Sequence, residues 1–574
     1  MASQFNSVPT IRHKRSRFDL SHSVKTSGSV GTLYPFEVQE VYAGDTFKVD
    51  TACVSRLSSN FIRPVVDNLF LDIYYFYVPS RLLYDKFVNI FGENTESAWA
   101  NTVEYTVPAV PSGLVYSKSV ADYMGLPVNL NANSNGVNPI NILPFRAFAK
   151  IYNEWFRDEN IIDPMHIQTG ESTSSEAFNN NDWSPSNYTG KLPKVAKLHD
   201  YFTSCLPAPQ KGSVVDIFPV SLPEQVLPVY ADLNGNEIPS TTKIKSGAIR
   251  FQRSDSSIFP NSPTPLGVSP HVPLTGGSSL TRGDLVYLPS GSTGQADQPI
   301  FPVNMWVDSS GVSLGSVSVN DLRFAFQYQK MLERDARSGT RYTEYIAAHF
   351  GVNAGDYRLQ RSEFLGGRRS PITITQVTQT TGSTESDPSS EPTLGSVAAY
   401  SLSNSRSRFT KGFVEHGYVI GVFCIRQFHS YQQGVERFWS RIKRTDFFDP
   451  VFSHIGEQPV YQQEIFADLT GKSTVKPILG YNEAWADLRY RPNRITGQMR
   501  SGLSISYDVW HFADYYANAP SLTPSWIEET PDYVDRTIAV DSTVSDQFLF
   551  DFYVKSVAYR PMPTYSVPSL IDHD

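Results

Sequence analysis

The chain has 574 residues, a formal net charge of −8 and 13% aromatic residues. This length predicts about four domains or one elaborated large domain. The composition excludes a collagen-like chain, a coiled coil and a fully disordered chain, and no apolar run is long enough for a membrane span. Aromatic side chains fit pleated sheets, so the sequence predicts a mainly β fold.

The first 18 residues form a basic segment. They include Arg12, Lys14, Arg15 and Arg17 but no acidic residue. Neither a helical nor a strand period is visible there. The pattern predicts a mobile basic arm over residues 1–30 that contacts phosphate groups, although a solvated tail without a partner has the same composition.

Periodicity predicts elements along the chain. Both faces of the strand at 67–78 (DNLFLDIYYFYV) are apolar, which indicates a strand covered on both sides. The other expected elements are a hairpin at 31–50, helices at 144–157, 321–337 (behind an Asn320 cap) and 342–350, and strands at 412–428, 503–510 and 548–553.

Two segments differ in composition from the rest. Residues 251–300 contain seven prolines and six glycines, which favours loops and short strands. A Ser/Thr-rich tract at 373–396 is low in complexity and predicts an exposed loop. We therefore expect a surface-projecting insertion at 195–315, flanked by a core of residues 31–194 and 316–574.

Signals of catalysis are weak in the sequence. It contains no His-x-His, and His416, Cys424 and His429 fit no zinc spacing. We expect no enzyme activity, no metal and no cofactor. Three scattered cysteines and no apolar N-terminal segment predict free thiols and synthesis in a reducing cytosol, without a secretory signal. The alternatives are a carbohydrate-binding or glycoside-cleaving β protein, and a monomeric adhesin or tail component.

Several blocks resemble one family. They are similar to the major capsid proteins of the Microviridae, the small icosahedral single-stranded-DNA phages, in the gokushovirus branch. The blocks are Pro64–Leu82, Leu143–Asn160, Leu332–Gly367, Glu415–Arg444, Leu479–Ser501 and Arg560–Asp574.

The resemblance implies a mainly β fold, an eight-stranded viral jelly roll with long inserted loops and a few helices. It further implies a T=1 icosahedral shell of copies of this chain around a circular single-stranded DNA genome. The 195–315 insertion would form a protrusion at the three-fold axes and attach to a host surface receptor. Minor virion proteins and assembly in the cytoplasm of a bacterial host are also implied.

The capsid interpretation assigns roles to particular residues. Arg12, Lys14, Arg15 and Arg17 become candidates for genome contact on the inner surface. Aromatic residues and arginine are favoured at permanent interfaces. Candidates for the subunit interface are therefore Trp439, Arg441, Trp485 and Arg491, although both tryptophans could equally be ordinary core residues.

Overall fold

The computed structural model divides the chain into two units. Unit 1 comprises Met1–Ser213 and Lys330–Asp574, and unit 2 comprises Val214–Gln329. The structure describes residues 14–93, 105–132, 138–173, 178–181, 183–212, 319–339, 341–353, 355–378, 397–467 and 476–565, and short strands between 229 and 307.

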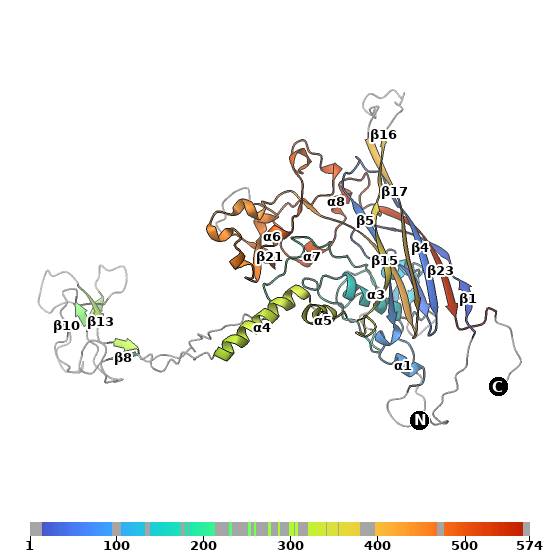
Figure 1. Cartoon of the computed structure of the whole chain (residues 1–574), viewed down its shortest axis with the longest axis horizontal. Coiled ribbons are helices and arrows are strands. Elements are labelled where there is room, and N and C mark those ends of the chain that lie inside the picture. The colour runs from blue at the N-terminus through green and yellow to red at the C-terminus, as the bar shows by residue number, and fades with distance from the viewer. Residues whose placement is uncertain are drawn as a thin grey trace. The chain divides into compact units, whose positions relative to one another are not determined.

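Two antiparallel sheets dominate unit 1 (Figure 1). The six-stranded sheet has the order β1-β23-β4-β17-β16, with β2 also paired to β23. Its strands are β1 (Ser16–Asp19), β2 (His22–Gly28), β4 (Thr46–Leu57), β16 (Ile374–Thr378), β17 (Val397–Gly412) and β23 (Phe548–Arg560). The four-stranded sheet has the order β15-β5-β18-β3. Its strands are β3 (Tyr34–Val41), β5 (Leu69–Pro79), β15 (Glu363–Ile372) and β18 (Gly417–Gln427).

The two sheets face each other across an aromatic core. Phe36 of β3 stacks on Phe552 of β23 with ring centroids 4.3 Å apart. Phe423 of β18 is fully buried and lies 4.6 Å from Phe550 and 5.1 Å from Phe552. Aromatic pairs at these separations add specific attraction to the area that they bury. The alternation of buried and exposed residues along β23 is the period-2 pattern expected from its sequence.

A helix covers the other side of the four-stranded sheet. Helix α3 (Leu143–Ile151) continues into a π-helical turn, Tyr152–Phe156. In that turn Trp155 and Phe156 contact Phe76 of β5, with ring centroids 5.3 and 5.9 Å away. Strand β5 is therefore buried on both faces, which confirms the prediction for residues 67–78.

One buried carboxylate ties three strands of the four-stranded sheet together. Asp72 of β5 has no exposed surface and accepts hydrogen bonds from Arg369 of β15 at 2.7 and 3.0 Å and from Arg426 of β18 at 2.6 and 3.1 Å. Two guanidinium groups compensate a charge that would be costly to bury alone.

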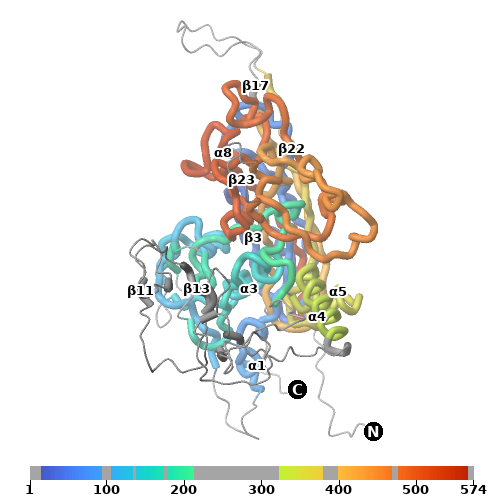
Figure 2. Tube along the Cα trace, turned by 90° about the vertical axis from the view of Figure 1, so that its left-hand side faces the viewer, coloured from blue at the N-terminus to red at the C-terminus, as the bar shows by residue number. Residues whose placement is uncertain are grey.

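The remaining helices and strands of the chain lie in the long connections. Helix α5 (Tyr342–Phe350) lies where the sequence predicts it, and His349 Nε2 lies 2.9 Å from Asp335 Oδ1 on the last turns of α4 (Val319–Ser338) (Figure 2). The short helices are α1 (Phe87–Ile90), α2 (Val120–Tyr123), α6 (Ala486–Arg489), α7 (Pro524–Ile527) and α8 (Asp532–Asp535). The short strands are β6 (Gly113–Leu114), β7 (Asn131–Ala132), β19 (Ser430–Tyr431), β20 (Glu457–Tyr461), β21 (Ile478–Glu483) and β22 (Asn493–Arg494).

Besides the first turns of α4, the described residues of unit 2 form short strands. A five-stranded antiparallel sheet has the order β10-β9-β13-β12-β11, and β14 pairs with β8. The strands are β8 (Val229–Ala231), β9 (Phe251–Arg253), β10 (Ile258–Phe259), β11 (Leu274–Gly276), β12 (Leu285–Tyr287), β13 (Gln298–Pro302) and β14 (Met305–Val307). Short strands agree with the proline- and glycine-rich composition.

Several local expectations differ from the structure. Strands β3 and β4 flank a turn with Gly44 at φ +91°, but they do not form the expected hairpin, because each pairs with strands of a different sheet. No strand forms at 503–510, where Leu503 and Ile505 are exposed and a 3-10 turn, Asp508–Trp510, follows. The alternating pattern there predicts a strand, but a strand is stable only when it pairs with a neighbouring strand.

The boundaries of the arm and of the insertion also differ. Residues 16–28 form β1 and β2, which pair with β23. The sequence pattern alone did not reveal this partner for their backbone hydrogen bonds. Unit 2 begins at Val214 rather than at 195, because Val195 and Phe202 are buried in unit 1. Helix α4 begins at Val319, so Asn320 lies inside the helix and is not its cap.

Candidate nucleic-acid interface

The six-stranded sheet has one face that the core does not cover. Residues of β4, β17 and β23 alternate between buried and exposed, and the exposed residues share register rows across the sheet. In one row, Ala52 of β4 lies opposite Tyr553 of β23 and Arg406 of β17. Figure 1 places α3 and α5 on the side of the other sheet. We call this exposed surface of the six-stranded sheet the open face.

Positive charge is concentrated on the open face. Its acidic side chains are Asp19, Asp50 and Asp551. The basic side chains on the same face outnumber these three acidic ones. There are seven of them: Arg17, Lys25, Lys48, Arg56, Arg406, Arg408 and Lys555. This excess of cations stands out in a chain whose net charge is −8.

Two carboxylates on the open face, Asp50 and Asp19, have a lowered pKa, which favours their charged form. A hydrogen bond from Arg406 lowers the pKa of Asp50, and the Arg406 Nε lies 2.6 Å from the Asp50 Oδ1. Hydrogen bonds from Ser21 lower the pKa of Asp19, with smaller effects from the nearby charges of Arg17 and Lys555. Arg56, Arg408 and Lys555 make no ion pair with any residue in the described part of the chain. Their charges remain available to an anionic partner.

Aromatic rings lie among these cations. Tyr400, Tyr553 and Tyr559 are 43%, 51% and 41% exposed on the open face. Tyrosine rings beside basic side chains form the kind of surface on which unpaired bases stack while phosphates meet cations. The arrangement can bind a single-stranded polyanion without reading its sequence.

The structure places most of the predicted arm residues at the edge of this face. Lys14 and Arg15 are exposed immediately before β1, and Arg17 lies in β1 opposite Tyr559. Arg12 lies outside the described residues. Sequence reasoning missed the cations on β4, β17 and β23. Alternation in the segment SRSRFTK, which puts Arg406 and Arg408 on one face, is a signal that could have found two of them.

The predicted interface residues fall into two groups. Trp439 is 71% exposed and Arg491 is also exposed, so both can reach a partner. Trp485 is only 5% exposed and packs within its own chain, and the Arg441 side chain is 11% exposed and forms an ion pair with Asp487. Trp485 is therefore a packing residue, as the alternative interpretation of this residue expects.

His429 is part of a buried ion cluster. Its ring lies 2.9 Å from Asp514 Oδ1 and 3.1 Å from Glu529 Oε2. Burial opposes a charge on this ring, but the two carboxylates outweigh burial and raise the pKa of His429 to about 10. Within the described residues, no group of three or more His, Cys, Asp or Glu side chains is arranged to hold a metal ion. In that same part of the chain, no helix has the length and apolar character needed to cross a membrane.

These features define a mainly β protein with a surface suited to a polyanion. The chain matches the family model described as "Capsid protein (F protein)" over residues 6–570. It is 35% identical to capsid protein VP1 of Chlamydia phage 1, with 99% of this chain and 98% of that protein covered. It is 37% identical to capsid protein VP1 of Spiroplasma virus 4 (97% and 95% covered) and 34% identical to that of Bdellovibrio phage phiMH2K (98% and 97% covered).

The chain belongs to this family of phage capsid proteins. The resemblance to gokushovirus-type capsid proteins of the Microviridae is thereby confirmed, and so is the expectation of a structural protein rather than an enzyme. Membership implies self-assembly into a shell and places the chain in the virion.

Proposed function

We propose that copies of this chain form a T=1 icosahedral shell around a circular single-stranded DNA genome, with the open face turned toward the DNA. The observation that carries this proposal is the set of exposed cations and tyrosines on one face of the six-stranded sheet. Basic side chains neutralise phosphates, and each stacked base contributes roughly 1–3 kcal/mol. A shell interior must tolerate a packed polyanion, and this surface supplies both kinds of contact.

The strand pairings support an eight-stranded jelly roll. In chain order the eight long strands are β2, β3, β4, β5, β15, β17, β18 and β23. The first pairs with the last, the second with the seventh, the third with the sixth and the fourth with the fifth. Such nested pairing is that of one long antiparallel hairpin rolled into two facing sheets, the arrangement called a jelly roll. In this arrangement β1 and β16 are additions at the edges of the six-stranded sheet.

The central insertion has a separate proposed role. Unit 2 is a compact unit that separates two parts of unit 1 along the chain, and its sequence is weakly charged and rich in glycine and proline. A composition that favours loops suits recognition, because binding residues are often carried on loops. We propose that it forms the protrusion at the three-fold axes and binds a receptor on the bacterial host. Exchanging residues 214–329 between related phages should move host range, and an unchanged host range would contradict this role.

Assembly and completion of the particle follow from the capsid role. We propose that the shell assembles in the cytoplasm of the host bacterium, where the three buried cysteines stay reduced, and that minor virion proteins complete it. Size-exclusion chromatography and electron microscopy of the purified protein test this. Uniform shells or their oligomeric precursors are expected, and a protein that stays monomeric at all concentrations would contradict it.

The genome contact is tested on particles. The triple variant Arg56→Ser, Arg408→Ser and Lys555→Ser removes cations of the open face that have no ion-pair partner in the described part of the chain. Particles of this variant should contain less DNA than wild-type particles, measured as the ratio of absorbance at 260 and 280 nm. A second variant with alanine at 12, 14, 15 and 17 tests the N-terminal cations in the same way. Unchanged DNA content in both variants would contradict the proposal.

A further inference from the structure

One long connection exposes far more apolar surface than its surroundings. From Gly434 to Pro459 no residue is buried. The segment 437–455 nevertheless contains eight large exposed apolar side chains, which we call the apolar segment: Phe438, Trp439, Ile442, Phe447, Phe448, Val451, Phe452 and Ile455. Soluble monomers rarely expose contiguous apolar surface of this kind, and larger patches mark interaction sites.

Contacts with residues later in the chain hold the apolar segment in place. Trp485 is buried and donates a hydrogen bond from Nε1 to the carbonyl oxygen of Phe452 at 2.9 Å. Its ring also meets that of Phe448 edge to face, with centroids 5.4 Å apart. Arg441 is anchored by its ion pair with Asp487. The segment is therefore held in place at these points, while its eight apolar side chains stay exposed.

The four basic residues of the apolar segment, Arg437, Arg441, Lys443 and Arg444, are balanced in number by Asp446 and Asp449 within it and by Glu464 and Asp487 beside it. Arg441 pairs with Asp487, Arg437 lies 3.9 Å from Glu464, and Arg494 lies 2.8 Å from Glu436. A surface without a strong charge of one sign is a poor site for DNA, whose binding depends on unpaired cations. Two identical surfaces of this kind do not repel each other, so a second copy of the chain is an acceptable partner.

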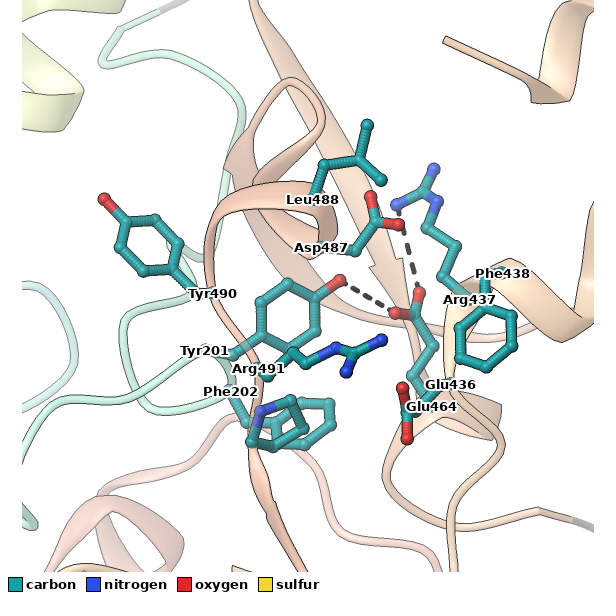
Figure 3. A pocket seen from close by; sticks show the side chains of 11 residues that line it. Tyr201, Phe202, Glu436, Arg437, Phe438, Glu464, Asp487, Leu488, Tyr490 and Arg491 are labelled. Atoms are coloured by element: carbon teal, nitrogen blue, oxygen red, sulfur yellow. Dashed lines mark hydrogen bonds and ion pairs between the residues drawn. The ribbon is translucent and has the colours of Figure 1, made fainter.

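A small cavity opens beside the apolar segment (Figure 3). It has a volume of about 120 Å³, and Phe438, Leu488, Tyr490 and Arg491 contribute to its lining. For comparison, an engineered cavity of about 150 Å³ holds one benzene molecule. The cavity therefore has room for about one apolar side chain.

Glu464, a buried polar group in the wall of this cavity, already has partners. Glu464 is almost fully buried, accepts a hydrogen bond from the Tyr201 hydroxyl at 2.8 Å and accepts another from the Tyr461 backbone N–H at 3.1 Å. Burial raises the pKa of Glu464. Because the Glu464 oxygens are engaged within the chain, an apolar side chain can enter the cavity without leaving this carboxylate unpaired.

We propose that the apolar segment is a contact between copies of this chain, and that the adjoining cavity receives an apolar side chain of the neighbouring copy. This inference rests on the proposed self-assembly and adds where one of the contacts lies. Permanent interfaces favour aromatic residues and arginine, which the segment supplies together. In a shell, every subunit also contacts other copies of the same chain.

The test places the photo-crosslinking residue p-benzoylphenylalanine at Trp439 in particle-forming protein, with the same residue at Tyr553 of the open face as the matched control. Both replacements exchange one exposed aromatic ring for another. Illumination of assembled particles should give, from position 439, a product of twice the subunit mass whose crosslinked peptides both come from this chain. Position 553 should give an adduct with DNA and no such dimer.

The outcomes separate the two proposals. Particles that form but give no chain-to-chain product from position 439, or give an adduct with DNA or with another virion protein, overturn the assignment of the segment and leave the capsid role intact. Wild-type protein that forms no particles overturns the proposed function itself. If the 439 variant does not assemble, Ile442, which is 87% exposed, provides a second labelling position with the same expected product.

Discussion

Salt dependence gives the sharpest quantitative test of the open face. Seven cations less three carboxylates leave four net positive charges there. For single strands the logarithm of affinity falls with the logarithm of salt concentration by about 0.7 per neutralised phosphate. The wild-type slope is then about −3, and raising salt from 50 to 200 mM weakens binding by about 50-fold. The variant Arg56→Ser, Arg408→Ser, Lys555→Ser should have a slope of about −0.7 and lose only about 3-fold.

The assay is fluorescence anisotropy of a labelled oligothymidine titrated with unassembled subunits over that range of salt. The matched control, Arg358→Ser, Arg368→Ser, Lys476→Ser, removes the same charge from exposed positions outside the six-stranded sheet. Its slope should equal that of the wild type. If the two triple variants lose the same slope, the DNA is attracted by overall charge and the assignment to the open face is refuted.

Three further predictions concern stability. Asp72→Asn leaves two arginines without their buried counter-ion and should destabilise the subunit by about 3–5 kcal/mol, seen as a lower urea midpoint, whereas an unchanged midpoint would show that the ion cluster contributes nothing. Phe423→Ala opens a cavity between the sheets and should cost about 3–5 kcal/mol in the same assay; a loss below 1 kcal/mol would mean that the core collapses to fill it. The pKa of His429 rises from 6.5 to about 10 on folding, so its contribution to stability is complete below pH 6.5 and is lost as pH rises through 10. The melting temperature of the wild type should therefore fall across that pH range, and that of His429→Gln should fall less. An equal fall in the two proteins would contradict the role of His429 in this pH dependence.

Strong local patterns were sufficient to predict much of the fold. The strand at 67–78 is apolar on both faces because a sheet and a helix cover it, and the helix at 342–350 lies where its pattern predicts it. Pairing partners were not accessible in the same way. Residues 31–50 have the pattern of a hairpin, yet β3 and β4 pair with strands that lie hundreds of residues away. Non-local pairing is set by the three-dimensional arrangement and leaves no local trace.

The candidate sites likewise combine residues that local sequence patterns reveal with residues that only the fold brings together. Clustering along the chain revealed Arg17 and its neighbours, but Lys48, Arg408 and Lys555 become one surface only when β4, β17 and β23 are placed side by side. Among the predicted interface residues, composition could not distinguish Trp439, which is exposed, from Trp485, which is buried. That difference depends on what packs around each ring, and sequence spacing does not record it.

Cryo-electron microscopy of DNA-filled particles tests the central claim most directly, since it shows at once whether copies of this chain form a closed shell and which face of the six-stranded sheet adjoins the nucleic acid. We expect a T=1 shell in which density for DNA lies against Tyr553, Arg408 and Lys555. Particles with that face on the outer surface, or DNA density confined to another face of the subunit, would contradict it.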